Sequence, residues 1–294
     1  MFFKIYSNLL HWPNKIFYPL KNFDNNESDT FKKIGFKHYK FDKKNKNFAN
    51  EVREKIKDTF LEENITKSLY KNPKSYTIDL FDNLEIDLKK KIESFFNNDQ
   101  ITFKVNSFLG LSMKLRNIKL MYNFYNKNTI KNEGPKMFHK DSDSLQDQIK
   151  IFFLINQIDK NNGMFYFIPN NILQADVKLP FERSLMQRSV KDKWRNFDET
   201  VISGAKKINK NLVPDEIIRS LDGNSGEMLF VDTGKIYHKG GYITDKDKYR
   251  LLIQATYTPR ISLSNWNKQN NKFLNYLMIK MINLKFKLMK TIKI

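Results

Sequence analysis

Apolar and polar residues alternate along several short segments between residues 101 and 260, which is the spacing of β-strands. Helical patterns do not alternate with these segments, so an antiparallel sandwich or barrel is favoured over a parallel sheet. We therefore predict a mainly β core of the double-sheet jelly-roll type over residues 101–260. The segments with this spacing are ITFKV, MKLRNIKLMYNFY, IKIFFLINQI, GMFYFIP, GEMLFVD and YRLLIQATYT.

The first hundred residues have mainly helical patterns. The stretch NFANEVREKIKDTFLEEN places Val52, Ile56 and Phe60 on one face of an amphipathic helix, and DTFKKIGFKHYKF is typical of a helix that leads into a strand. Because this region contains no chemical motif, residues 1–100 are expected to pack on the core. The predicted fold class of the whole chain is α+β with a mainly β core.

Two further segments lie outside the strand pattern. The stretch from about residue 171 to 225 is too long for a turn and carries Trp194 among several basic residues, so we predict a lid or a substrate-selecting insert. Residues 261–294 contain FLNYLMIKMINLKFKLMKTIKI, the pattern of a basic amphipathic helix. Docking of this helix on the domain or on a dimer partner is favoured over weak attachment to a membrane surface.

The chain has 294 residues and no cysteine. Disulfides, zinc–thiolate sites, iron–sulfur clusters and thiol nucleophiles are therefore excluded, which leaves histidine, aspartate and glutamate as ligands for a transition metal. There are four histidines. Two of them, His11 and His38, have no carboxylate at ligand spacing and are interpreted as surface or packing residues.

The formal net charge is +20, from 52 lysines and arginines against 32 aspartates and glutamates. Such a surface attracts phosphate. However, the abundance of Asn, Ile, Phe and Tyr is typical of an AT-rich genome, and no arginine-rich run, zinc-finger spacing or aromatic RNA-binding motif accompanies the lysines. Nucleic acid is therefore not expected as a partner, and an acyl thioester, a nucleotide sugar or an anionic lipid headgroup would suit the charge equally well.

Neither a membrane span nor a signal peptide is predicted. Lysine and asparagine interrupt every hydrophobic run before it is long enough to cross a bilayer. The first twenty residues lack the compact apolar region and the small-residue cleavage site of a secretory signal. A cytoplasmic location is expected.

The candidate chemistry lies in His139, Asp141 and His238. Side chains at positions i and i+2 of an extended strand point the same way, so His139 and Asp141 can reach one metal ion while Lys140 faces elsewhere. Two imidazoles and one carboxylate leave three cis positions open on iron(II), the number needed to hold an organic acid and dioxygen together. These three residues predict a non-haem iron site.

Four segments follow one another in a characteristic order: FHKDSD, NNGMFYFIPNN, GEMLFVDTGKIYHKGG and YRLLIQATYTP. Taken in this order, they resemble the phytanoyl-CoA dioxygenase family of iron(II)- and 2-oxoglutarate-dependent oxygenases, and the resemblance covers roughly Met121 to Pro259. It implies a double-stranded β-helix, a cupin-like jelly roll, with iron held by the three residues named above. It also implies hydroxylation of an unactivated carbon of a small-molecule, lipid or acyl substrate by dioxygen, with succinate and CO2 as co-products.

Arg250 is the expected cofactor residue. 2-Oxoglutarate chelates iron through its keto and C1 carboxylate oxygens, and a guanidinium suits the far carboxylate because it can donate two parallel hydrogen bonds. Arg250 follows His238 by twelve residues, and a hairpin over KGGYITDKDKY is expected to bring it into the same pocket. The family has its cofactor arginine at similar spacing. Met121 falls where the family places a residue against the cofactor, but strand core is an equally good interpretation.

Some points stay open. Asp143 offers a second carboxylate on the strand face of Asp141; the family pattern favours Asp141, and a carboxylate at either position argues against a halogenase, in which a small residue replaces this ligand. Asp232 and Asp245 are interpreted as turn or capping residues. The alternatives to an enzyme are a non-catalytic jelly-roll binding protein and a basic peripheral membrane protein. The substrate is not identified by the sequence.

Overall fold

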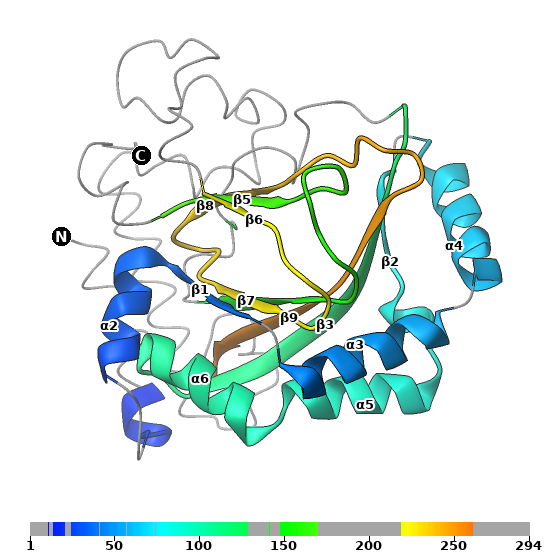
Figure 1. Cartoon of the computed structure of the whole chain (residues 1–294). Coiled ribbons are helices and arrows are strands. Elements are labelled where there is room, and N and C mark those ends of the chain that lie inside the picture. Colours follow the sequence, from blue (N-terminus) through cyan, green and yellow to red (C-terminus); the bar gives the residue numbers. More distant parts are fainter. Residues whose placement is uncertain are drawn as a thin grey trace, which may run out of the picture.

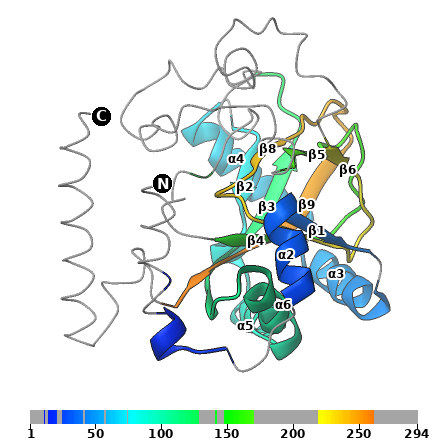
Figure 2. The same cartoon turned by 90° about the vertical axis from the view of Figure 1, so that its left-hand side faces the viewer.

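The computed structural model describes residues 11, 14–20, 25–40, 42–56, 58–73, 75–128, 141, 148–169 and 219–260. Within them, two antiparallel sheets face each other, and helices cover the outer face of the larger sheet (Figures 1 and 2). The strands are β1 (Phe36–Tyr39), β2 (Thr77–Asp79), β3 (Met113–Phe124), β4 (Ile149–Leu154), β5 (Phe165–Ile168), β6 (Arg219–Leu221), β7 (Met228–Val231), β8 (Tyr237–Gly240) and β9 (Tyr249–Pro259). The helices are α2 (Asn25–Ile34), α3 (Lys43–Lys55), α4 (Asp58–Lys71), the short η1 (Phe81–Asn83), α5 (Ile86–Phe96) and α6 (Asp99–Leu109).

The strand order defines the fold. The larger sheet has the order β1-β7-β4-β9-β3-β2 and the smaller one the order β6-β5-β8. The pairs are nested along the chain, because β5 pairs with β6, β4 with β7, and β3 with β9. In this arrangement the innermost strands pair first and each pair farther out encloses the one before it, while the chain passes back and forth between two sheets. Such nested pairing is typical of the jelly roll, or double-stranded β-helix. The predicted α+β class and jelly-roll core are confirmed.

Strand alternation gives the larger sheet two different faces. One set of alternate residues on β4 and β9 packs against the helices, and the other set packs toward the smaller sheet. The first set is Ile149, Ile151, Phe153, Leu251, Ile253, Ala255 and Tyr257, and the second set is Phe152, Leu154 and Leu252. The space between the sheets, where the second set lies, also contains the candidate site.

Aromatic contacts attach the helices to the strands. Phe96 of α5 is fully buried, and its ring meets that of Phe153 edge to face with centroids 6.2 Å apart. Phe108 of α6 meets Phe230 in the same way at 5.3 Å. Edge-to-face pairs of this kind contribute about 1 kcal/mol each beyond the area they bury. The helix layer thereby packs on β4 and β7, and β4 supplies Lys150 and Phe152 to the wall of the site.

The segment ITFKV was predicted as the first core strand, and this prediction is wrong because it forms part of α6. The Oδ1 atom of Asn98 accepts the backbone N–H of Ile101 at 2.9 Å as the N-cap, and the helix ends at Gly110 in a left-handed conformation. Ile101, Val105 and Phe108 are buried at helical spacing. The capping residues therefore favour a helix here, although the apolar residues also alternate as in a strand.

The single helix predicted over NFANEVREKIKDTFLEEN is also wrong. Helix α3 ends at Lys55, and the buried Ile56 has an extended backbone before α4 begins at Asp58. By contrast, the helix leading into a strand that was predicted over DTFKKIGFKHYKF is confirmed, because α2 is followed by β1. Strands β1 and β2 occupy the two edges of the larger sheet.

The hairpin expected over KGGYITDKDKY is a crossover instead. Strand β8 belongs to the smaller sheet and β9 to the larger one, so this segment passes from one sheet to the other. His238 and Arg250 consequently reach the space between the sheets from opposite sides.

The predicted lid lies largely outside the described residues, as do Trp194 and the predicted C-terminal helix. In the part of the chain that the structure describes, no helix has the length and apolar character needed to cross a membrane.

Candidate functional site

His238 and Asp141 meet between the two sheets. His238 lies on β8, which pairs with β5, and is buried. Its Nδ1 atom is 3.2 Å from the carbonyl oxygen of Ile236, and its Nε2 atom is 3.9 Å from Oδ2 of Asp141. A carbonyl accepts but does not donate, so Nδ1 carries the proton and the lone pair of neutral His238 is on Nε2. The imidazole thus directs Nε2, the nitrogen whose lone pair can bind a metal ion, toward Asp141.

Asp141 is held by several groups at once. Its backbone N–H donates to the carbonyl of Thr233 at 2.9 Å. Its Oδ2 atom accepts from the Lys150 ammonium at 2.8 Å and from the Gln148 amide at 3.3 Å, and that amide also donates to the hydroxyl of Thr233 at 3.1 Å. The carboxylate orientation is therefore determined by the chain itself.

The charges around Asp141 keep it ionised. Burial alone would raise the pKa of this carboxyl group, but the positive charge that His238 carries when protonated and the ammonium of Lys150 lower the pKa to about 2. Asp141 is consequently a carboxylate at neutral pH, as a metal ligand must be.

These two donors fit a non-haem iron site in type and orientation. Carboxylate oxygen and imidazole nitrogen are ligands that iron(II) accepts, and the Ile236 carbonyl supplies the outer hydrogen bond that usually fixes a metal-binding histidine. Within the described residues, no group of three or more histidines and carboxylates forms a complete metal site. His139, the third predicted ligand, and Asp143, the competing carboxylate, lie outside the described residues.

Arg250 on β9 is buried and directed into the same space. Its Nε atom donates to Oδ1 of Asn123 at 3.2 Å, and its Nη1 atom donates to the carbonyl of Gly163. Burial lowers the pKa of the guanidinium to about 10, an effect that Tyr76 opposes, so Arg250 remains a cation at neutral pH. A buried cation of this kind needs an anion to offset its lost hydration.

The backbone leaves room beside the guanidinium. A Cβ atom added to Gly240 would lie 3.1 Å from Nη2 of Arg250, and one added to Gly163 would lie 3.1 Å from Nη1. Gly163 also has a φ of 89°, a conformation that favours glycine. The two glycines therefore allow strands of the smaller sheet to approach the arginine closely.

A cavity of about 270 Å³ connects these residues. Asp141, His238, Arg250 and Met121 all line it, so the structure brings together every described residue that the sequence predicted for the site. Its other walls are formed by Tyr76, Thr77, Lys119, Asn123, Lys150, Phe152, Phe165, Gly240, Gly241, Leu252 and Gln254.

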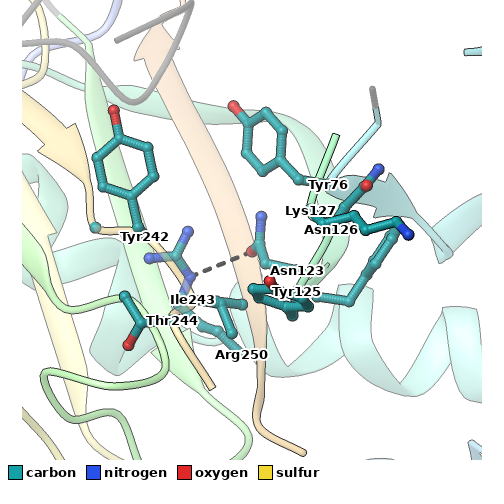
Figure 3. A pocket seen from close by; sticks show the side chains of 11 residues that line it. Tyr76, Asn123, Tyr125, Asn126, Lys127, Tyr242, Ile243, Thr244 and Arg250 are labelled. Carbon is teal, nitrogen blue, oxygen red and sulfur yellow. Dashed lines mark hydrogen bonds between the residues drawn. The ribbon is translucent and has the colours of Figure 1, made fainter. Parts of the chain in front are cut away.

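A second cavity, of about 480 Å³, also borders Arg250. Figure 3 shows the guanidinium below the rings of Tyr76 and Tyr242, with its hydrogen bond to Asn123. Arg250, Asn123, Tyr76 and Gly241 line both cavities, so the arginine stands at their junction.

The remaining sequence predictions concern residues outside the cavity. Asp232 and Asp245 are turn residues, because the carbonyl of Asp232 accepts the N–H of Ile236 and Oδ1 of Asp245 accepts the N–H of Asp247. His38 lies outside the cavity, and its Nε2 atom is 2.8 Å from Oε2 of Glu227, a carboxylate partner that the sequence spacing did not predict.

Sequence reasoning missed Lys150, Lys119, Asn123 and Tyr76. Lys150 could have been found, since a lysine inside the apolar run IKIFFL interrupts a strand that is otherwise buried. Asn123 could have been found only from strand register, because it is the direct partner of Arg250 across β3 and β9. Tyr76 precedes β2 and carries no sequence signal for the site.

No family model matches the chain, and no curated protein matches it. Among solved structures, the chain is similar to the epimerase SnoN in complex with Fe3+, alpha ketoglutarate and nogalamycin RO, at 12% identity and a TM-score of 0.48 over 80% of this chain and 82% of that chain. It is similar to EvdO2 from Micromonospora carbonacea var. aurantiaca complexed with 2-oxoglutarate, at 10% identity and a TM-score of 0.47 over 82% and 92% of the two chains. It is also similar to HygX from Streptomyces hygroscopicus with nickel, 2-oxoglutarate and hygromycin B bound, at 12% identity and a TM-score of 0.46 over 81% and 88%. Likenesses at this level do not assign the chain to a family, and membership of the phytanoyl-CoA dioxygenase family stays a prediction.

Proposed function

We propose that this chain is an iron(II)- and 2-oxoglutarate-dependent oxygenase. The observation that carries the proposal is that Asp141, His238 and Arg250 line one cavity between the sheets of a jelly roll. A carboxylate and an imidazole suit the metal, and a buried guanidinium suits the far carboxylate of a metal-bound 2-oxoacid. His139 is the third metal ligand in this proposal.

Each residue has a separate task. Asp141 and His238 hold the metal, with the carboxylate oriented by Lys150 and Gln148 and the imidazole oriented by the Ile236 carbonyl. Arg250 pairs with the far carboxylate of 2-oxoglutarate, which offsets the cost of burying the guanidinium. Met121 forms part of the cavity wall beside the cofactor.

The bound iron and 2-oxoglutarate supply the oxidation, in which dioxygen is consumed, 2-oxoglutarate yields succinate and CO2, and the substrate is oxidised. The protein supplies position and exclusion of water. Phe152 and Phe165, whose ring centroids are 4.9 Å apart, form an apolar wall next to His238. An apolar wall at this place suits a C–H bond as the point of attack, and hydroxylation of a carbon is the reaction that we propose.

The test is anaerobic calorimetry with Mn(II) in place of iron(II), followed by titration of 2-oxoglutarate into the metal-loaded protein. We expect the wild-type protein to bind Mn(II), and to bind 2-oxoglutarate only when the metal is present. His238→Ala should lose both, because loss of a direct ligand weakens metal binding by more than the roughly 10- to 100-fold cost of losing an outer hydrogen-bond partner. His11→Ala, which changes a histidine outside the cavity, is the matched control.

If the metal and 2-oxoglutarate bind, release of succinate identifies turnover and permits a substrate screen. If folded wild-type protein binds neither Mn(II) nor 2-oxoglutarate, the oxygenase proposal is ruled out. The alternative, a non-catalytic jelly-roll binding protein, is then favoured. Equal Mn(II) binding by the wild type and His238→Ala would place the metal elsewhere.

A further inference from the structure

Two lysines line the cavity that contains Asp141 and His238. Lys119 is on β3 and Lys150 on β4, and β9 lies between these two strands. Lys119 is opposite Gln254 on β9, and Gln254 is opposite Phe152, which lies two residues after Lys150 on the same strand face. Neighbouring strands are about 4.8 Å apart and Lys150 is offset from Lys119 by two residues along the strand, so the two lysine backbones are roughly 12 Å apart, a separation that two extended lysine side chains can close.

These lysines lie away from Arg250. The inward residues of β9 follow the order Arg250, Leu252, Gln254, and Lys119 is level with Gln254 whereas Asn123 is level with Arg250. Four residues of extended strand span roughly 13 Å. The lysines therefore serve a different part of the cavity from the guanidinium.

The cavity carries an excess of positive charge. Its described lining residues include three permanent cations, Lys119, Lys150 and Arg250, against one carboxylate, Asp141. A divalent metal and the dianion 2-oxoglutarate bring opposite charges of equal size, so their binding leaves this excess in place. A further anion in this cavity would offset the excess.

Only one of the two lysines has an anionic partner in the described part of the chain. Lys150 pairs with Asp141 at 2.8 Å, and its side chain is 17% exposed. No described carboxylate lies within ion-pair distance of the half-buried Lys119. An ammonium group that faces a cavity without a counterion is available to bind a ligand oxyanion.

The wall next to the lysines is apolar. Phe152 lies between the strand positions of Lys150 and Leu154, and its ring meets that of Phe165, which in turn stacks on His238 at 5.7 Å. Leu252 and Met121 continue this wall. The cavity thus combines a basic region with an apolar surface beside the metal-binding residues.

We propose that Lys119 and Lys150 bind a carboxylate or phosphate group of the substrate, and that the substrate is an amphiphilic anion whose apolar part lies along Phe152 and Phe165. The term substrate rests on the proposed oxygenase function, but the anion-binding subsite does not. Lys119 is a binding residue in this assignment, and Lys150 both binds the anion and positions Asp141.

The experiment uses hexanoate and hexan-1-ol as matched probes that share an apolar chain and differ in charge. Each is titrated by calorimetry at constant ionic strength, first into metal-free protein and then into protein loaded with Mn(II) and 2-oxoglutarate. The variants are Lys119→Gln and, as a control on an exposed position of the same strand, Lys114→Gln. Inorganic phosphate, titrated in the same way, tests the second oxyanion.

We expect wild-type protein and Lys114→Gln to bind hexanoate alike and more tightly than hexan-1-ol. Lys119→Gln should bind hexanoate about tenfold more weakly, with hexan-1-ol unchanged, because one charge-assisted hydrogen bond is lost. Equal hexanoate affinity in Lys119→Gln and wild type, or equal affinity of the wild type for the two probes, would overturn the subsite. If Mn(II) and 2-oxoglutarate do not bind, the oxygenase proposal fails while the metal-free titration still decides on the lysines.

Discussion

The Nε2 atom of His238 lies 3.9 Å from Oδ2 of Asp141, although β4 to β7 separate the two residues in the chain. The jelly-roll topology brings them together, because His238 is on the smaller sheet and the Thr233 carbonyl, just before β8, holds the backbone of Asp141. Arg250 then enters the same cavity from the larger sheet. The geometry of the site is therefore a property of the fold.

Substitution of Arg250 should weaken 2-oxoglutarate binding without removing the metal. We expect Arg250→Gln to reduce affinity about 100-fold, and Arg250→Lys to reduce it about tenfold, because lysine keeps the charge but loses the paired hydrogen bonds. Calorimetry on Mn(II)-loaded protein measures both. Unchanged Mn(II) binding is the internal control for a folded site, and full 2-oxoglutarate affinity in Arg250→Gln would show that the cofactor binds elsewhere.

Gly240→Ala tests the position of the guanidinium while leaving its charge in place. The new Cβ atom would lie 3.1 Å from Nη2 of Arg250, tighter than ordinary contact, so the guanidinium must shift. We expect 2-oxoglutarate affinity to fall about tenfold, a cost typical of misplacing one charge-assisted hydrogen bond. Mn(II) affinity should stay within twofold of the wild type. A loss of metal binding instead would mean that β8 as a whole had moved.

Lys150→Met should change how the stability of the metal-free protein depends on pH. In the wild type the Asp141 pKa of about 2 lies below the ordinary value of 3.8, so this carboxylate stabilises the fold above about pH 4 and the contribution is lost as the pH falls toward 2. Without the Lys150 ammonium, fewer groups oppose the effect of burial, so the Asp141 pKa is higher than in the wild type and that stabilisation is lost at higher pH.

Urea unfolding between pH 3 and 6 in the presence of a chelator measures this effect. We expect the free energy of unfolding to be on the order of 2 kcal/mol lower in Lys150→Met than in the wild type at pH 6, and the difference to shrink toward pH 3. Lys114→Met should show no pH-dependent difference. A constant difference at every pH would attribute the loss to packing of the lysine side chain.

The hydrogen bond between His38 and Glu227 should stabilise the attachment of β1 to β7. The Glu227 side chain is only 6% exposed, and its partners are the His38 imidazole at 2.8 Å and the Asn224 amide at 3.1 Å. Removal of one partner of a buried pair costs about 3 kcal/mol because the remaining charge stays buried. His38→Ala should therefore lower the free energy of unfolding by about this amount in urea denaturation.

Two variants make the His38 result interpretable. Glu227→Gln in the His38→Ala background removes the buried charge and should recover part of the lost stability. His11→Ala should change stability by less than about 0.5 kcal/mol. If Glu227→Gln lowers stability further in that background, the carboxylate has another role.

Much of the core strand pattern could be predicted, because alternation of apolar side chains follows directly from burial of one strand face. The segments of β4, β5, β7 and β9 were identified in this way, and the order of His238 and Arg250 suggested their common site. The prediction of a strand over ITFKV was wrong because its apolar residues fit both the strand period and the helix period. The decisive signals were the capping residues, Asn98 before the segment and Gly110 after it. The end of α3 before Ile56 was not predicted, because a buried apolar residue continues a helical pattern even where the backbone is extended.

The sequence by itself determined the kinds of side chain available to this protein: no thiol, few histidines, and a carboxylate, an imidazole and a guanidinium in an order that suits a metal-bound 2-oxoacid. Only the tertiary structure decided which groups surround them. Strand register and the stacking of two sheets produce three of these contacts. They are the ion pair of Lys150 with Asp141, the hydrogen bond of Arg250 with Asn123, and the position of Lys119 in the same cavity. Such contacts join residues far apart in the chain, and local spacing carries no record of which strands will be neighbours.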